Sequence, residues 1–200
     1  MLVGRRLITG ALHAAVDAAV GGAGGVVLLT GEAGMGKTAL ASEAVAYAKA
    51  LGAAAAWGTC WEADGSPGFW PWIQVIRELA SDGSETGEAA LAELTGAAHS
   101  EGGVLGDQSA FRFRTYDAAA TYLRGRASQR PLVVVLDDLH WADASSLRLL
   151  VFLARQVHDV AILVIGTYRD LEITTGDHLT LRARSSPNWP SRLNRCSSLA

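Results

Sequence analysis

The eight residues from Gly31 to Thr38 have the types and spacing of a phosphate-binding loop. They read Gly-Glu-Ala-Gly-Met-Gly-Lys-Thr, which satisfies the whole pattern G-x-x-x-x-G-K-[ST]. Glycines let such a loop turn tightly and aim its backbone N–H groups at phosphate; here they are Gly31, Gly34 and Gly36. Lys37 can reach the β- and γ-phosphates of a nucleotide, and Thr38 can offer its hydroxyl to Mg²⁺. The alternative, a glycine turn without a ligand, gives the Lys-Thr pair no packing reason to be there.

A pair of carboxylates follows the most apolar run of the chain. Asp137 and Asp138 come directly after Leu132–Leu136, which is typical of a strand buried on both faces. Beside a phosphate loop, Asp137 can hold Mg²⁺ through water, and Asp138 can orient or deprotonate an attacking water. Arg169 ends the next apolar run and can contact a γ-phosphate. The simpler alternatives are an ordinary acidic turn for the aspartates and a surface loop for the arginine.

Several neighbouring side chains are explained more simply by structure than by chemistry. His140 follows the acidic pair, and a lone loop histidine is more often a hydrogen-bonded structural residue than a catalyst. Trp141 is expected to pack over the edge of the site or to serve a neighbouring domain. Phe69–Trp72 is expected to pack in the core, with a partner surface as the alternative. Stacking on single-stranded nucleic acid would need a basic groove that does not accompany these aromatic residues.

The order of elements predicts an α/β fold, with a doubly wound, mostly parallel sheet and helices on both faces. Buried strand patterns alternate with helical periods, and ligands of such folds bind at the carboxyl ends of the strands. The expected strands are residues 26–29, 54–59, 132–136 and 160–166. The expected helices are residues 7–20, 38–51, 69–79, 88–98, 111–126 and 144–157. The phosphate loop, the two aspartates and Arg169 all fall where strands end.

Composition is that of a globular domain. The chain has 200 residues, of which 50% are hydrophobic and 18% charged, so it can bury a core. The net charge is −3, but residues 173–200 carry one acid and four arginines, which leaves −6 on residues 1–172 and argues against a polyanion partner. Cys60 and Cys196 have no metal-like spacing and suggest reduced thiols in a cytoplasmic protein. No stretch is apolar enough to predict a membrane span, and no signal-peptide pattern is visible.

Five motifs in this order resemble the AAA-type ATPase module of the STAND-class signal-transduction ATPases. The nearest resemblance is to the large ATP-binding LuxR-type transcriptional regulators of actinobacteria. The most specific motif is the string Leu-Asp-Asp-Leu-His-Trp-Ala-Asp that begins at Leu136. The motifs are Leu2-Val3-Gly4-Arg5, Gly31–Thr38, Phe69–Trp72, Leu136–Asp143 and Gly166–Asp170.

The resemblance implies a role for each matching position. Lys37 and Thr38 would bind phosphate and Mg²⁺, Asp137 would be the Walker B aspartate, and Arg169 would be the first sensor. A P-loop NTPase of this kind would use ATP and Mg²⁺ as its ligands.

The resemblance also implies a regulatory use of the nucleotide. Gly4 and Arg5 would lie near the adenine. ATP would act as a switch ligand that opens an assembly-competent state, and slow hydrolysis would reset it. The expected partners are ATP and ADP, together with either a second copy of the chain or the missing downstream domains. No membrane partner is expected.

The resemblance ends near residue 172. We therefore expect an ATPase core over residues 1–172 and an irregular tail, with a possible loss of reading frame, over residues 173–200. The tail is rich in Ser, Arg, Pro and Asn and shows no apolar period. In the family, sheet order 5-1-4-3-2 places a fifth core strand beside the first, and a helical lid and further domains follow. We expect both the lid and the fifth strand to be lacking, so that Val26–Leu29 lies on an open edge.

Three alternatives to a weakly hydrolysing switch module follow from the same motifs. A stand-alone P-loop enzyme, such as a small-molecule kinase, would need an arginine-rich lid and an acceptor pocket. An initiator-like protein acting on DNA would need a basic surface or winged helix before residue 173, so we expect no specific DNA binding by this chain alone. A non-functional truncated fragment would bind nucleotide poorly.

Overall fold

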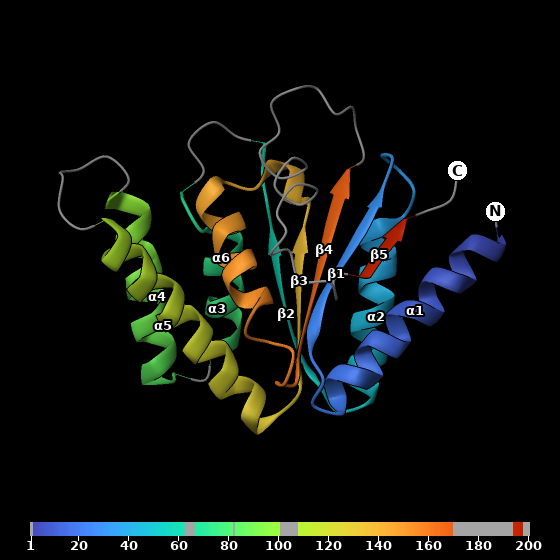
Figure 1. Ribbon diagram of the computed structural model, residues 1–200, viewed down its shortest axis with the longest axis horizontal. Helices are drawn as coiled ribbons and strands as arrows, with labels where there is room; N and C mark the ends of the chain where they lie inside the picture. The colour runs from blue at the N-terminus through green and yellow to red at the C-terminus, as the bar shows by residue number, and fades with distance from the viewer. Residues whose placement is uncertain (1, 63–66, 82, 101–107, 170–193, 198–200) are drawn as a thin grey trace.

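The computed structural model describes residues 2–62, 67–81, 83–100, 108–169 and 194–197 (Figure 1). The strands are β1 (Gly25–Gly31), β2 (Ala54–Thr59), β3 (Leu132–Asp137), β4 (Ile162–Arg169) and β5 (Asn194–Ser197). The helices are α1 (Leu2–Val20), α2 (Lys37–Ala50), α3 (Trp70–Leu79), α4 (Glu85–Ser100), α5 (Gln108–Gln129) and α6 (Ala144–Ala154), with one 3₁₀ turn, η1 (Leu139–Trp141). In the described part of the chain, no helix is both long enough and apolar enough to cross a bilayer.

The sheet separates two layers of helices, as the sequence predicts. Alternate residues of a strand point to opposite faces, and β3 is buried along its whole length. Val133 and Val135 pack with α1 and α2, whereas Leu132, Val134 and Leu136 pack with the layer formed by α3–α6. Figure 1 shows these two groups of helices on opposite sides of the sheet. The predicted α/β class with a parallel sheet is therefore confirmed.

The strand order is β2-β3-β4-β1-β5, and every neighbouring pair is parallel. The expectation that the fifth strand is lacking is wrong, because β5 pairs with Val27–Thr30 of β1. Its sequence, Asn-Arg-Cys-Ser, has no apolar pattern, and a strand pairs through backbone groups that any residue carries. Residues 170–193 and 198–200, the rest of the expected tail, lie outside the described residues.

Several elements extend further than predicted, and two of these extensions, in α1 and β4, involve predicted site residues. Helix α1 begins at Leu2 rather than Leu7, so Gly4 and Arg5 lie inside it instead of before it. No proline interrupts residues 2–7, and a single glycine costs a helix only about 1 kcal/mol. Strand β4 continues past Gly166 to Arg169 because β1 also continues, and Gly31 pairs with Arg169. This extension carries three polar residues of β4 to the level of the phosphate loop.

Helix α3 covers the outer edge of β2. The Glu78 carboxylate accepts a hydrogen bond from the Trp57 N–H at 2.8 Å, and the Gln74 amide donates to the Thr59 carbonyl at 2.9 Å. A Cβ on Gly58 would lie 2.1 Å from the Pro71 carbonyl oxygen, so the close approach of α3 requires glycine there. The two side chains thus bind backbone groups that another strand would otherwise bind.

The aromatic run that opens α3 lies in the core, in agreement with the first of the two interpretations of the sequence. Phe69 and Trp72 are buried. The Trp72 indole N–H donates to the Ser146 carbonyl at 3.0 Å, which ties α3 to α6. Trp70 is half-buried, and the Arg77 guanidinium lies over its ring.

Candidate functional site

The phosphate loop connects β1 to α2 with the backbone conformation that its glycines allow. Gly34 and Gly36 both have φ of 78°, in the left-handed region that favours glycine. Gly36 is the N-cap of α2, and no side chain caps the helix. The first N–H groups of α2 therefore remain available to an anion, and the helix dipole adds a positive potential at the same place.

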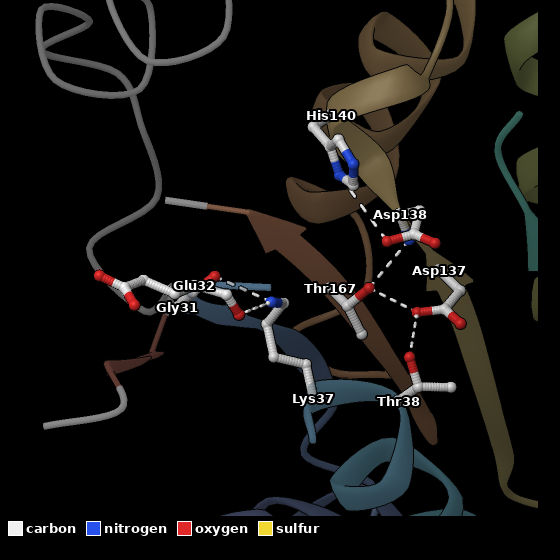
Figure 2. Close-up of polar contacts among 8 residues, drawn as sticks. All are labelled: Gly31, Glu32, Lys37, Thr38, Asp137, Asp138, His140 and Thr167. Carbon is white, nitrogen blue, oxygen red and sulfur yellow. Dashed lines mark hydrogen bonds and ion pairs between the residues drawn. The ribbon is translucent and has the colours of Figure 1, made fainter. Parts of the chain in front are cut away.

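Lys37 folds back over its own loop. Its ammonium donates to the carbonyl oxygens of Gly31 and Glu32, each at 2.8 Å (Figure 2), and the residue is only 9% exposed. Burial, and then the positive charge of Arg169, lower the pKa of Lys37, while Asp138 and Asp137 oppose them. An ammonium has three N–H groups, so one further donor is left for a ligand.

Asp137 accepts hydrogen bonds from hydroxyl groups on two other elements. It ends β3 and is 6% exposed. Its Oδ1 atom accepts from Thr38 Oγ1 at 3.2 Å and from Thr167 Oγ1 at 2.5 Å (Figure 2). The first bond joins the start of α2 to β3, and the second joins β3 to β4. A buried carboxylate beside the phosphate loop is thus held by two hydroxyls on one oxygen.

Asp138 has a strained backbone that Thr167 stabilises. Its φ of 58° and ψ of 46° are left-handed, a conformation that few residues other than glycine adopt and that Asp tolerates better than most. The Asp138 N–H donates to Thr167 Oγ1 at 2.8 Å. The turn directs the Asp138 side chain, which is 38% exposed, toward solvent at the carboxyl edge of the sheet. We call Asp137, Asp138, His140 and Thr167 the acidic edge.

Thr167 was missed by the sequence analysis. It is the first polar residue of β4, and it is fully buried. Because Leu136 pairs with Gly166, the residues that follow each of them, Asp137 and Thr167, lie side by side. The signal in the sequence was the Gly-Thr step in the Gly166–Asp170 motif, but its meaning depends on the register between β3 and β4.

The one-turn helix η1 is fixed against β4 at the acidic edge. A Cβ on Gly166 would lie 2.4 Å from Leu139 Cδ1 and 2.8 Å from Leu28 Cδ2, so any other residue there would displace these side chains. Leu139 is buried and anchors the turn. The following His140 side chain is 13% exposed, with Nδ1 lying 3.8 Å from Asp138 Oδ1. Trp141 is exposed at the rim.

The structure gathers most of the predicted site residues, but not all. Lys37, Thr38, Asp137 and Asp138 meet at the carboxyl edge, and Arg169 lies opposite Gly31 in the β1–β4 register. Gly4 and Arg5 lie in the first turns of α1, where the side chains are outside the described residues. The roles assigned to all of these residues remain predictions.

The donor set suits Mg²⁺ better than a metal held by the protein alone. Within the described ranges, no group of three or more His, Cys, Asp or Glu side chains could hold a metal ion. Mg²⁺ in nucleotide sites is usually held by one or two protein ligands, with water and phosphate oxygens completing its octahedron. The Thr38 hydroxyl and the Asp137 carboxylate, in contact with each other, fit that requirement.

A comparison with known protein families agrees with the prediction of a nucleotide-binding domain that was made from the phosphate loop. The family described as AAA ATPase domain matches residues 1–165 of the chain. No curated protein matches it. Among solved structures, the chain is similar to Drosophila ORC bound to AT-rich DNA and Cdc6, with 14% identity, a TM-score of 0.44, and coverage of 98% of this chain and 57% of that one.

Two further solved structures show the same level of similarity. Drosophila ORC bound to DNA has 13% identity and a TM-score of 0.47, over 95% of this chain and 40% of that one. C. elegans PCH-2 has 12% identity and a TM-score of 0.43, over 96% of this chain and 42% of that one. The chain thus spans between 40% and 57% of the length of these three structures, and similarities this low support no conclusion about function.

Proposed function

The chain belongs to the AAA ATPase domain family, whose members are nucleotide-binding modules, and from that premise we propose that it binds ATP with Mg²⁺ and hydrolyses it slowly. The observation that carries the proposal is the contact between Thr38 and Asp137 beneath the uncapped start of α2, with Lys37 folded over the same loop. Support for the proposal comes from the closeness of an uncapped helix start, a cation and two oxygen groups that suit Mg²⁺.

Each residue has a distinct part in this proposal. The backbone N–H groups of the phosphate loop and Lys37 bind the phosphates, and Lys37 leaves one or both of its carbonyl partners to do so. Thr38 and Asp137 hold Mg²⁺, which supplies charge neutralisation on the phosphate oxygens. Arg169 contacts the γ-phosphate from the end of β4. Gly4 and Arg5 lie toward the adenine.

Asp138 is the residue we assign to the attacking water. It accepts the proton of the water as the oxygen bonds to the γ-phosphorus, and the bond to the β–γ bridging oxygen breaks to leave ADP. The left-handed backbone of Asp138, and the hydrogen bond from its N–H to Thr167, fix the position from which its side chain extends. Because its side chain is more exposed than that of Asp137, it can exchange the proton with solvent.

We also propose that the nucleotide works as a switch in a signal-transduction ATPase of the STAND class, in a LuxR-type regulator. The support is the set of five motifs, above all the string that begins at Leu136. ATP would shift the population toward an assembly-competent state only as far as its affinities for the two states differ. The composition change after residue 172 supports a truncated or frameshifted copy, and sequencing the adjacent frames of the locus tests that point.

A thermal melt with and without Mg-ATP tests nucleotide binding. A ligand that binds the folded state at 100 times its dissociation constant adds about 2.7 kcal/mol of stability, so the melting temperature should rise by several degrees. Lys37→Ala should abolish the rise. Lys49→Ala is the matched control, because Lys49 is the only other lysine of the chain and lies in the last turn of α2. If Mg-ATP leaves the melting temperature of the wild type unchanged, the proposal is contradicted.

A further inference from the structure

His140 is a nearly buried side chain whose ring nitrogens make no hydrogen bond with the part of the chain that the structure describes. Both ring nitrogens are buried, and neither makes a hydrogen bond. A neutral imidazole has one donor and one acceptor, and leaving such a group unsatisfied in the interior costs about 1–3 kcal/mol. A histidine that served packing alone would be replaced by an apolar ring without that cost.

The ring is held in place by packing rather than by hydrogen bonds. Its centroid lies 5.0 Å from that of Trp141 and 6.2 Å from that of Tyr168, which it meets edge-on. The turn that carries it is anchored by Leu139 against Gly166. The position of the imidazole is therefore fixed before any polar partner reaches it.

The nearest polar partner is the carboxylate of Asp138. His140 Nδ1 lies 3.8 Å from Asp138 Oδ1, about 1 Å beyond a hydrogen bond (Figure 2). The Asp138 N–H donates to Thr167, and the Asp138 side chain is 38% exposed. A small rotation of Asp138 would satisfy the buried Nδ1 atom. Burial lowers the pKa of His140, and the carboxylate of Asp138 opposes this change.

We propose that His140 is a positioning residue for Asp138, and that its Nδ1–H group donates to the carboxylate and holds it toward the attacking water. This inference rests on the proposed ATP hydrolysis. A catalytic base is most effective when a third group orients it, and here the orienting group comes from the same turn, two residues along the chain. The exposed carboxylate has few other constraints, so the fixed imidazole decides its orientation.

Three variants separate this role from packing. His140→Phe keeps a ring between Trp141 and Tyr168 but removes the donor. His140→Asn places an amide N–H near the position of Nδ1, whereas His140→Gln places one near Nε2. We expect His140→Phe and His140→Gln to slow single-turnover hydrolysis by about 10- to 100-fold, with the dissociation constant of Mg-ATP within about twofold of the wild type. His140→Asn should stay within about threefold of the wild-type rate.

Two kinetic results would overturn the inference. One is a wild-type rate in His140→Phe. The other is a large loss of Mg-ATP affinity with an unchanged rate at saturation, which would mean that His140 contacts the nucleotide itself. If His140→Phe shows no cooperative melt, the Asn and Gln variants decide, because equal rates in those two variants contradict a donor at Nδ1.

A second readout needs no nucleotide. Nitrogen-15 NMR of the imidazole, assigned by the signal missing in His140→Phe, reports which nitrogen carries the proton. We expect the Nδ1–H tautomer in the wild type and its loss in Asp138→Gly, a variant that accepts the left-handed backbone. An Nε2–H tautomer in the wild type overturns the inference. If the wild type binds Mg-ATP but does not hydrolyse it, the proposed hydrolysis fails, and this tautomer alone decides the role of His140.

Discussion

The phosphate loop and the acidic edge lie on the two sides of one site, but they are assembled over very different distances in the chain. The loop is eight consecutive residues, and the bonds of Lys37 reach back only five and six positions. The acidic edge depends on Thr38 and Asp137, which are 99 positions apart, and on Asp137 and Thr167, which are 30 apart. The first region is local, and the second exists only after the sheet has formed.

This difference separates two properties of the site. In the proposed function the loop and the start of α2 bind phosphate directly, so nucleotide binding without Mg²⁺ should survive changes at the acidic edge. The proposed hydrolysis would need Asp137, Asp138 and Thr167 in register, so it should be lost more easily. The predictions that follow test whether binding and hydrolysis divide along this line.

The largest effect is expected from Lys37→Ala. The variant loses charge-assisted hydrogen bonds to phosphate, each worth about 1.5–3 kcal/mol, so the affinity for ATP should fall by about 100-fold or more. The loss should be the same with and without Mg²⁺, because Lys37 belongs to the loop. Calorimetric titration with ATP, in Mg²⁺ and in EDTA, measures both values. A loss of ATP affinity that appears only with Mg²⁺ would contradict the separation between the phosphate loop and the acidic edge.

Asp137→Asn should weaken only the part of binding that depends on Mg²⁺. Removing the buried carboxylate should lower Mg-ATP affinity by about 10- to 100-fold, as changes at metal sites commonly do. ATP in EDTA should bind as well as before or better, because a negative charge has gone. The same titrations give the answer, and equal losses in both buffers would mean that Asp137 supports the loop itself.

Thr167→Val should separate hydrolysis from binding. The variant keeps the shape of the side chain but removes the acceptor of the Asp138 N–H and the donor to Asp137. We expect about 1–3 kcal/mol of destabilisation, hydrolysis about tenfold slower, and little change in Mg-ATP affinity. Thr167→Ser, which keeps the hydroxyl, is the control. Urea unfolding and single-turnover rates of the two variants test the point.

Gly36→Ala tests the local geometry of the loop. At φ of 78° an alanine costs about 1–2 kcal/mol, so the free energy of unfolding should fall by that amount. Gly125→Ala is matched, since Gly125 is an exposed glycine inside α5 with open space around its Cβ position, and it should raise stability by about 0.5–1 kcal/mol. Opposite signs in urea unfolding are expected, and a loss in both would point to a cause other than φ.

The last prediction concerns charge. Burial, with the carboxylates of Asp143, Asp138 and Asp137, raises the pKa of the Cys60 thiol from 9.0 to about 12, whereas burial and Arg169 lower that of Lys37. Above pH 9 the unfolded chain releases the thiol proton and the folded chain keeps it, so stability should fall by about 1 kcal/mol per pH unit. Cys60→Ala should lack this dependence when unfolding is compared at pH 8.5 and pH 10. Parallel pH profiles would contradict it.

The parts that were predictable from sequence are those that rest on local chemistry. The phosphate loop and the four long strands follow from glycine spacing and from apolar runs such as Leu132–Leu136. Asp137 and Asp138 stood out because they end the most apolar run. The order of the strands came from the family resemblance, since no local pattern fixes which strands are neighbours.

The parts that were missed depend on pairing between distant segments. Thr167 is an ordinary strand residue until the register sets it beside Asp137. The strand β5 has no apolar signal because it joins the sheet through its backbone. The extended start of α1 was missed because the sequence there neither favours a helix strongly nor interrupts one. Sequence patterns indicate which local conformation a residue favours, whereas these features depend on which distant residues come into contact with it.

Helix α3 covers the β2 edge of the sheet, so the two edges of the sheet are not equivalent. Glu78 binds the N–H of Trp57, and Gln74 binds the carbonyl of Thr59. These two backbone groups of β2 are therefore not available to pair with an extended peptide. Among the described residues, the opposite edge of the sheet is β5, which pairs with only four residues of β1. A helix with an amide and a carboxylate four residues apart thus occupies, at the β2 edge, backbone groups through which β-augmentation by another chain would proceed.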